Sequence, residues 1–187
     1  MRIIAGKYKG RNLYSIEGSG TRPTTSSFRE YIFSVYQNFE GKKVLDLFAG
    51  TGALGIEALS RGAAFAHFVE MSNSALKPLF ANIEYVKCSD ECKVHKRNVL
   101  SYLKKCDEKF DVIILDPPYN KGLVEKVIEL ILENNLLLPN GAIIIEHYKR
   151  ETIPEKYNNI ITYSKCKKIA GLTIIEPDAT EQENENL

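Results

Sequence analysis

Apolar residues recur in short runs along most of the chain, and the spacing of the runs predicts alternating strands and helices. Seven runs after residue 42 are apolar or β-branched and have the length of strands: "KVLDLF", "FAHFVE", "CKVHK", "FDVIIL", "GAIIIE", "NIITY" and "LTIIE". Four stretches between the first five runs have the length of helices: residues 53–61, 73–87, 98–105 and 122–135. This alternation predicts an α/β fold with a mostly parallel seven-stranded sheet and helices on both faces. The last two runs lack a helix-length spacer, so we expect them to form an antiparallel pair at one sheet edge.

The N-terminal part of the chain has a different pattern. "RIIA" and "RNLYSI" flank "GKYKG", whose glycines suit a turn, and this predicts a β-hairpin over residues 2–16. A linker rich in Gly, Ser, Thr and Pro follows. Ser27 and Glu30 then have the spacing of a capping box before an apolar stripe, which predicts an amphipathic helix. The stripe consists of Phe28, Ile32, Val35 and Phe39.

Charge and composition divide the chain into three parts. Residues 1–42 carry seven basic and three acidic residues, and a basic stretch of this kind favours a polyanion partner or a merely solvated surface. Residues 43–176 contain the alternating pattern and form the expected main domain. Residues 177–187 are rich in Glu and Asn, and we expect this tail to be disordered.

The remaining bulk properties set limits on the class of protein. The chain has 187 residues with 44% hydrophobic content, which suits one domain with a substantial core. No apolar run approaches the ~20 residues that span a bilayer, and the first residues lack a signal-peptide core, so we expect a cytoplasmic protein. The four cysteines (Cys88, Cys92, Cys106 and Cys166) lack zinc-site spacing. We therefore expect reduced thiols and no metal.

A glycine-rich loop follows the first run of the main domain. Gly50, Gly52 and Gly55 form a G-x-G-x-x-G pattern between a strand and a helix, and Glu70 ends the next strand twenty residues after Gly50. These features are typical of a dinucleotide site, although a tight strand–helix turn without a ligand would also explain the glycines.

Asp46 favours a different cofactor. It lies four residues before Gly50, where a pyrophosphate would lie close to its carboxylate and be repelled. S-adenosylmethionine has no phosphate and carries an ammonium group that this acid could hold. Glu70 suits both cofactors, because each contains an adenosine ribose, and a carboxylate can accept hydrogen bonds from the two ribose hydroxyls. The glycines would let the backbone approach the methionine portion closely.

The stretch "LDPPY" ends the fourth run with an acid, two prolines and an aromatic ring. Proline gives no N–H to a sheet and forces the preceding residue to be extended, so the strand must end at Asp116. The Asp116 carboxylate and the Pro117 carbonyl could accept both hydrogens of an exocyclic amine on a nucleobase, aiming its lone pair at a methyl sulfonium. Pro118 stiffens the loop, and Tyr119 offers a face for stacking. A proline-terminated strand with a capping acid would explain only part of this motif.

Four motifs together resemble one family. "MRIIAGKYKGRNL", "RPTTSSFREYIF", "LDLFAGTGALGIEALSRGA" and "LDPPY" are similar to motifs of the bacterial 16S ribosomal RNA guanine-N2 methyltransferases of the RsmD type. The resemblance covers residues 1 to about 176. It implies a Rossmann-like methyltransferase fold, S-adenosylmethionine as the methyl donor and a guanine of small-subunit rRNA as the acceptor. By position it implies two sets of residues: a cofactor set of Asp46, Phe48, Gly50, Gly52, Glu70 and Asn98, and a catalytic loop of Asp116, Pro117, Pro118 and Tyr119.

Two positions depart from the family pattern. Asn98 stands where an acid commonly contacts the adenine amino group, and its side-chain oxygen can still accept that hydrogen bond. "IAGLT" at 169–173 replaces a more usual tyrosine–glycine pair. For RNA binding we expect contacts from Lys7, Lys9 and Arg11 of the hairpin and from Arg22 of the linker. We expect a monomer that acts on 16S rRNA or a subunit assembly particle.

Other residues and functions stay open on the sequence alone. Arg29 could lie on the solvated side of its helix, and we expect His147 at the surface and His67 and His95 within strands. An N6-adenine methyltransferase shares "DPPY", whereas a protein-glutamine methyltransferase would prefer Asn at position 116. An NAD-dependent oxidoreductase would keep the glycines without a use for "DPPY". A non-catalytic RNA-binding module is the remaining alternative.

Overall fold

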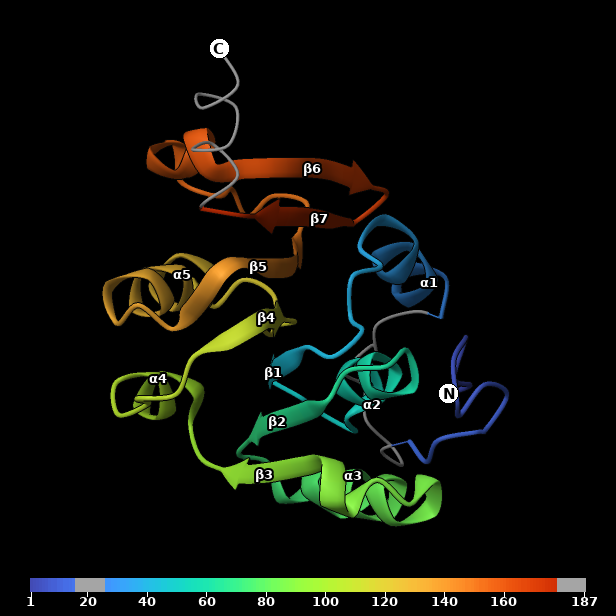
Figure 1. The fold of residues 1–187 in the computed structure, drawn as a ribbon. Coiled ribbons are helices and arrows are strands. Elements are labelled where there is room, and N and C mark those ends of the chain that lie inside the picture. Colours follow the sequence, from blue (N-terminus) through green and yellow to red (C-terminus); the bar gives the residue numbers. More distant parts are fainter. Residues whose placement is uncertain (16–25, 178–187) are drawn as a thin grey trace. The chain divides into compact units, whose positions relative to one another are not determined.

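The computed structural model describes residues 1–15 and 26–177, and the chain divides into two compact units, Met1–Arg97 and Asn98–Leu187 (Figure 1). The boundary at residue 42 that the sequence predicts stays a prediction. The N-terminal segment belongs to the same unit as the first three strands, because it docks on one of the helices between them.

The first unit contains three parallel strands in the order β3-β2-β1. They are β1 (Lys43–Leu47), β2 (Phe65–Glu70) and β3 (Cys92–Lys96). Its helices are α1 (Ser26–Val35), α2 (Ala53–Ser60), α3 (Asn73–Val86) and the short 3-10 helix η1 (Ser89–Glu91). The strands, α2 and α3 lie where the hydrophobic pattern predicted them. α1 differs, because it includes Ser27, the predicted cap, and ends at Val35, before the Phe39 of the predicted stripe. Pro78 lies inside α3, which begins at Asn73.

The second unit contains four strands in the order β4-β5-β7-β6. They are β4 (Phe110–Leu115), β5 (Leu137–Tyr148), β6 (Ile161–Lys167) and β7 (Ala170–Ile175), with helices α4 (Val99–Leu103), α5 (Leu123–Glu133) and the 3-10 helix η2 (Glu155–Ile160). β4 and β5 are parallel, and β7 runs antiparallel to both β5 and β6. The predicted antiparallel pair is confirmed. All seven predicted strands form, and most of the strand pairs within the two units are parallel.

The predicted hairpin is reduced to a chain reversal. A single antiparallel bridge joins Arg2 to Asn12, and no regular strand forms within residues 1–15. The reversal is closed by the Ile3 amide, which donates to the Arg11 carbonyl at 2.9 Å, and by the Gly10 amide, which donates to the Ile3 carbonyl at 2.9 Å. Residues 1–15, called the N-terminal arm below, bond to α2 instead of extending as paired strands.

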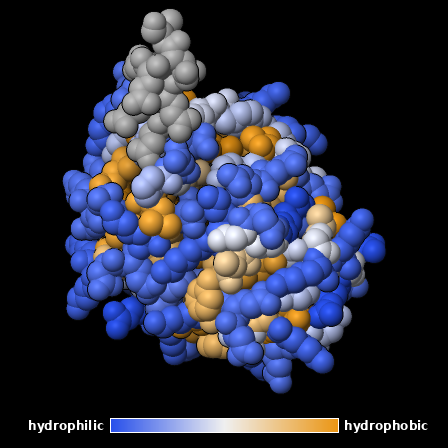
Figure 2. Space-filling view, in the orientation of Figure 1, coloured by the Kyte–Doolittle hydropathy of each residue, from blue (hydrophilic) through white to orange (hydrophobic). Residues whose placement is uncertain are grey.

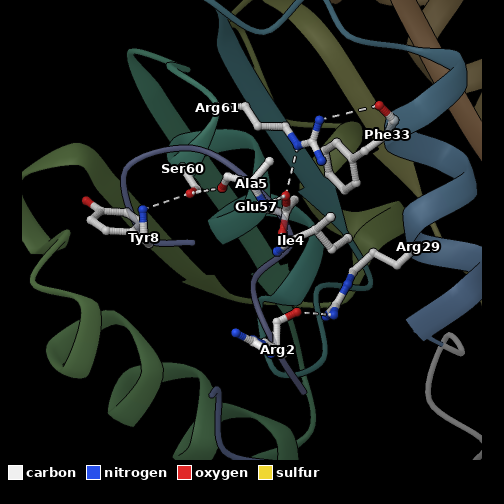
Figure 3. Close-up of polar contacts among 9 residues, drawn as sticks. All are labelled: Arg2, Ile4, Ala5, Tyr8, Arg29, Phe33, Glu57, Ser60 and Arg61. Carbon is white, nitrogen blue, oxygen red and sulfur yellow. Dashed lines mark hydrogen bonds and ion pairs between the residues drawn. The ribbon is translucent and has the colours of Figure 1, made fainter. Parts of the chain in front are cut away.

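A buried carboxylate on α2 holds the arm (Figure 3). Glu57 is 1% exposed, and its Oε2 accepts the Ile4 amide at 2.8 Å while its Oε1 accepts the Ala5 amide at 3.0 Å. The Nε of Arg61, one helical turn later, also donates to Oε1 at 2.8 Å. A buried charge is stable only when it is paired and hydrogen-bonded, and Glu57 meets both conditions.

Ser60 provides a second set of bonds to the arm. Its hydroxyl accepts the Tyr8 amide at 3.0 Å and donates to the Ala5 carbonyl, and its own carbonyl accepts the Lys7 amide at 2.7 Å. A Cβ at Gly6 would lie 1.6 Å from the Ser60 carbonyl oxygen, and Gly6 has a φ of +79°. Only glycine lets the arm approach the helix this closely.

Arg29 of α1 is buried, contrary to the expectation that it could be solvated. It is 2% exposed, and its guanidinium donates to the Arg2 carbonyl. Burial lowers the pKa of Arg29, while the nearby charge of Glu57 opposes that shift. The sequence left this position open, because the helical pattern does not reveal that the Arg29 guanidinium bonds the arm at the Arg2 carbonyl, near the charge of Glu57.

We expect Glu57→Ala to destabilise the protein by about 2–4 kcal/mol, because two partly buried amides and a guanidinium lose a charged acceptor together. Urea unfolding measures the change. Glu84→Ala on the exposed face of α3 is the matched control, and it should change stability by no more than about 0.5 kcal/mol. Equal effects of the two substitutions would show that Glu57 does not anchor the arm.

Candidate functional site

The glycine loop connects β1 to α2 through left-handed backbone. Phe48, Gly50 and Gly52 have φ values of +60°, +57° and +79°. The Gly52 amide donates to the Ala49 carbonyl at 2.8 Å, which closes a tight turn. A left-handed residue other than glycine costs about 1–2 kcal/mol, so Phe48 is held in a strained conformation at a predicted cofactor site.

The glycines of this loop are required for different reasons. A Cβ at Gly52 would lie 2.4 Å from Leu79 Cδ1, and a Cβ at Gly55 would lie 2.4 Å from Phe68 Cε1. Packing therefore excludes side chains at both positions. A Cβ at Gly50 would have no atom closer than the Phe48 carbonyl oxygen at 3.9 Å. Gly50 has the conformation of a glycine and also open space beside it, which is compatible with close approach of a ligand.

Asp46 supports the loop from the buried side. It is 1% exposed, and its Oδ2 accepts the Gly55 amide at 2.8 Å. This carboxylate near the first turn of α2 is favourable, because the amides there have no partner within the helix. One oxygen of Asp46 is thus already engaged, and contact with a cofactor ammonium remains a prediction.

Glu70 connects the loop to the start of α3. Its Oε2 accepts the Gly50 amide at 2.8 Å, and its Oε1 accepts the amides of Met71 and Ser72 at 2.8 and 2.7 Å. A carboxylate has about four acceptor sites, so three amides leave room for one more donor. Glu70 lies at the predicted end of β2, and its contact with ribose hydroxyls remains a prediction.

The "DPPY" loop follows β4 in the second unit and is fixed by two glutamates. Pro117 is buried, and the Tyr119 hydroxyl donates to Glu146 Oε1 at 3.0 Å. Glu151 accepts the Asn120 amide at 3.0 Å and the Tyr148 amide at 3.2 Å. The Tyr119 and Tyr148 rings lie 5.5 Å apart between centroids.

Sequence analysis missed both glutamates. Glu146 ends the run "GAIIIE" and is 3% exposed, which is unusual for an acid and visible only in the structure. Glu151 lies beyond that run. Asn98 has a structural task as well, because its Oδ1 accepts the Ser101 amide at 3.2 Å and caps α4. Its proposed contact with adenine remains a prediction.

His147 is buried, which corrects the expectation of a surface position. It is 4% exposed in β5, with its Nε2 3.1 Å from Thr173 Oγ1 and its Nδ1 3.0 Å from the Tyr148 carbonyl oxygen. A Cβ at Gly171 would lie 2.4 Å from the His147 ring, which accounts for the glycine in "IAGLT". His67 and His95 lie in β2 and β3 as expected, with Nδ1 and Nε2 3.0 Å apart.

The basic residues predicted to contact RNA have unequal surroundings. Lys7 forms an ion pair with Glu91 at 2.5 Å, and the Arg11 guanidinium donates to the carbonyls of Tyr85 and Val86 at 3.3 and 3.2 Å. Lys9 is exposed. Arg22 lies outside the described residues. Hydrophilic residues cover most of the face in Figure 2, so hydropathy alone does not locate an RNA-binding surface on it.

Other kinds of site find no support in the part of the chain that the structure describes. Residues 1–15 and 26–177 contain no cluster of three or more His, Cys, Asp or Glu suited to a metal ion. Their helices include none long and apolar enough to cross a bilayer. The four cysteines are free thiols.

Comparison with known proteins gives consistent matches over nearly the whole chain. A family model described as conserved hypothetical protein 95 matches residues 1–176. The ribosomal RNA small subunit methyltransferase D of Haemophilus influenzae is 36% identical over 176 residues, covering 87% of this chain and 91% of that protein. Its namesake in Escherichia coli strain K12 is 35% identical over 155 residues, covering 82% and 78%. The solved structure of Escherichia coli yhhF is 32% identical, has a TM-score of 0.82 and covers 94% of this chain and 97% of its own.

We expect Gly52→Ala to be much more destabilising than Gly41→Ala. Gly41 has a φ of +69° with nothing within 4 Å of an added Cβ, so its substitution adds backbone strain alone, about 1 kcal/mol. Gly52→Ala adds the clash with Leu79 to the same strain, and we expect a total loss of about 2–4 kcal/mol. Urea unfolding of both variants tests this, and similar losses would mean that the loop adapts to a side chain.

Proposed function

The chain belongs to the family described as conserved hypothetical protein 95 and has the predicted Rossmann-like methyltransferase fold, and on that premise we propose that it transfers a methyl group from S-adenosylmethionine to the N2 amine of a guanine in 16S rRNA. The names of the Haemophilus influenzae and Escherichia coli relatives support methyl transfer to small-subunit rRNA. The guanine-N2 position is supported by the four motifs that resemble the RsmD-type enzymes.

The observation that carries the proposal is the anchored "DPPY" loop. Its tyrosine hydroxyl is bonded to a buried glutamate and the amide after it to Glu151, so the loop is fixed at its C-terminal end. Two prolines restrict the backbone at its N-terminal end. Groups that are fixed before the substrate binds need little reorganisation as charge develops during the reaction.

The first unit would hold the donor, which supplies a methyl group on a positively charged sulfur when bound. The space beside the Gly50 Cα is open, so a ligand could approach the loop there. Glu70 has one acceptor site left for a ribose hydroxyl. Asp46 adds a negative charge behind the loop that favours an ammonium group. Phe48 belongs to the same proposed cofactor set, whereas Asn98, also in that set, lies in the second unit.

The second unit would hold the acceptor amine. The lone pair of a guanine N2 is delocalised into the ring, which makes it a weak nucleophile. Acceptance of its two hydrogens by Asp116 and the Pro117 carbonyl would hold the nitrogen out of the ring plane and direct its lone pair. Transfer would form the nitrogen–carbon bond and break the methyl–sulfur bond of the donor, which would leave as S-adenosylhomocysteine. The Asp116 carboxylate would stabilise the cationic amine before it loses a proton to water. Tyr119 would stack on a base that has been unpaired or flipped out.

RNA binding, cellular location and oligomeric state are further parts of the proposal. Lys9 is exposed on an arm that is fixed to α2, and it is the first candidate for a phosphate contact. Lys7 and Arg11 could reach RNA only by giving up or sharing their contacts with Glu91 and the end of α3. An rRNA substrate supports a location in the cytoplasm, and a monomer stays the expected oligomeric state.

Asp116→Ala should reduce the rate of methyl transfer by about 10²-fold or more, because one of the two acceptors for the amine is lost. S-adenosylhomocysteine should raise the melting temperature of the variant as it does that of the wild type, whereas NAD should raise neither. The substrate is 16S rRNA or a small-subunit particle, and nucleoside analysis identifies the product.

Asp90→Ala, in the exposed η1, is the control and should keep full activity. Near-normal turnover by Asp116→Ala would mean that another group holds the amine. Stabilisation of the wild type by NAD alone would favour an oxidoreductase, and a product other than N2-methylguanosine would overturn the assigned position.

Lys9→Ala should flatten the slope of log affinity for RNA against log salt by about 0.7, the effect of one phosphate contact on a single strand. Arg11→Ala should leave that slope unchanged and instead lower stability by about 1 kcal/mol, because the Arg11 guanidinium bonds the last carbonyls of α3. Filter binding over a range of salt concentrations measures the slope, with Lys126→Ala on α5 as the control. A flatter slope for Arg11→Ala but not for Lys9→Ala would reverse these assignments.

A further inference from the structure

One buried amide joins the N-terminal arm to the glycine loop. The Asn82 side chain of α3 is 0% exposed, and its Oδ1 accepts the Tyr14 amide at 2.7 Å. Its Nδ2 donates to the Tyr14 carbonyl at 3.2 Å and to the Thr51 carbonyl at 2.9 Å. Both hydrogens of the amide are therefore used, one toward the arm and one toward the loop.

The geometry favours a fixed connection over an incidental contact. A primary amide offers two donors, and each Asn82 hydrogen has its own carbonyl acceptor in segments far apart in the sequence. Thr51 lies between the two left-handed glycines Gly50 and Gly52, so its carbonyl direction depends on the conformation of both. A buried donor to this carbonyl selects one orientation of the peptide plane.

The same helix supports the loop at a second point. Leu79 lies one turn before Asn82 in α3. A Cβ at Gly52 would be only 2.4 Å from its Cδ1. Leu79 packs against the loop without directional bonds, whereas Asn82 bonds a specific carbonyl. α3 therefore contributes both the packing surface and the polar contact that fix the Thr51–Gly52 peptide.

We propose that Asn82 is a positioning residue for the cofactor, which fixes the glycine loop in its binding conformation and makes the arm backbone part of that support. The inference rests on the proposed function, because it assigns S-adenosylmethionine to the glycine loop. None of the sequence motifs indicated this role, and Asn82 itself need not touch the cofactor. The arm thus has a role beyond the proposed RNA contact, because the Tyr14 backbone bonds the Asn82 side-chain amide that orients the loop.

Asn82→Leu tests the direct connection, because leucine has a similar size and no hydrogen-bonding group. We expect the Kd for S-adenosylhomocysteine, measured by calorimetry, to rise about tenfold as the loop samples other conformations. The KM for S-adenosylmethionine should rise by a similar factor, whereas kcat at saturating donor should stay within about twofold, because the "DPPY" loop is unchanged. Ile83→Ala, at the neighbouring buried position, is the matched control. It should lower stability and leave the Kd within about twofold.

A second pair of variants separates the arm backbone from its side chain. Tyr14→Pro removes the amide that donates to Asn82 Oδ1, and we expect it to raise the Kd about three- to fivefold. Tyr14→Ala removes the exposed ring and keeps that amide, so the Kd should not change. Urea unfolding of each variant shows that it is folded at the temperature of the titration.

The outcomes separate this inference from the proposed function. If the wild type binds S-adenosylhomocysteine and Asn82→Leu binds it equally well, the positioning role is wrong and the proposed function stands. Equal losses for Asn82→Leu and Ile83→Ala would also overturn the inference, since general destabilisation would then explain both. If the wild type itself does not bind S-adenosylhomocysteine, the proposed function fails. If Asn82→Leu does not fold, the Tyr14 pair still decides, and equal Kd values for its two members would overturn the inference.

Discussion

Backbone amides that lie in irregular, partly buried structure need acceptors, and in the first unit carboxylates provide them. Glu57 accepts two amides of the N-terminal arm, Asp46 accepts the Gly55 amide, and Glu70 accepts the Gly50 amide with two at the start of α3. Glu57 and Glu70 each connect a segment without regular structure to a helix or strand, whereas Asp46 connects β1 to the first turn of α2. The arm, the glycine loop and α2 are therefore held by charge-assisted bonds, and apolar packing fills the space around them.

This arrangement gives α2 a central position. Its first turn is bonded to Asp46 of β1, and its last turn carries Glu57 and Ser60, which hold the arm. The ten residues "GALGIEALSR" thus contain both the glycines that shape the proposed ligand loop and the polar side chains that bond the N-terminal arm. Asn82 of α3 adds a further connection between the arm and the loop. The arm, where an RNA contact is proposed, is therefore linked through Asn82 to the glycine loop of the proposed cofactor site.

The sequence was sufficient for the regular elements and insufficient for the polar contacts between them. β2 and β4 coincide with their predicted runs, because buried parallel strands are short apolar segments bounded by turn residues. β3 coincides with its run as well, although its residues are only partly buried or exposed. The predicted hairpin forms only as a chain reversal with one antiparallel bridge, because its apolar flanks and turn glycines did not reveal that α2 supplies the arm's acceptors. Arg29, His147 and Glu146 were missed or misplaced since each is a polar residue whose burial depends on one distant partner. Local pattern carries no information about such partners, whereas the glycines and prolines of the two loops constrain their own backbone and were identified.

The account's central claim is that the arm is an integral part of the first unit. Native-state hydrogen exchange in increasing urea tests it directly on the ligand-free protein. The amides of Ile4 and Ala5, which donate to Glu57, should open with the same free energy and urea dependence as the core amides of α2. Exchange of Ile4 and Ala5 through a low-energy opening that leaves α2 protected would contradict the claim and make the arm a separately mobile segment.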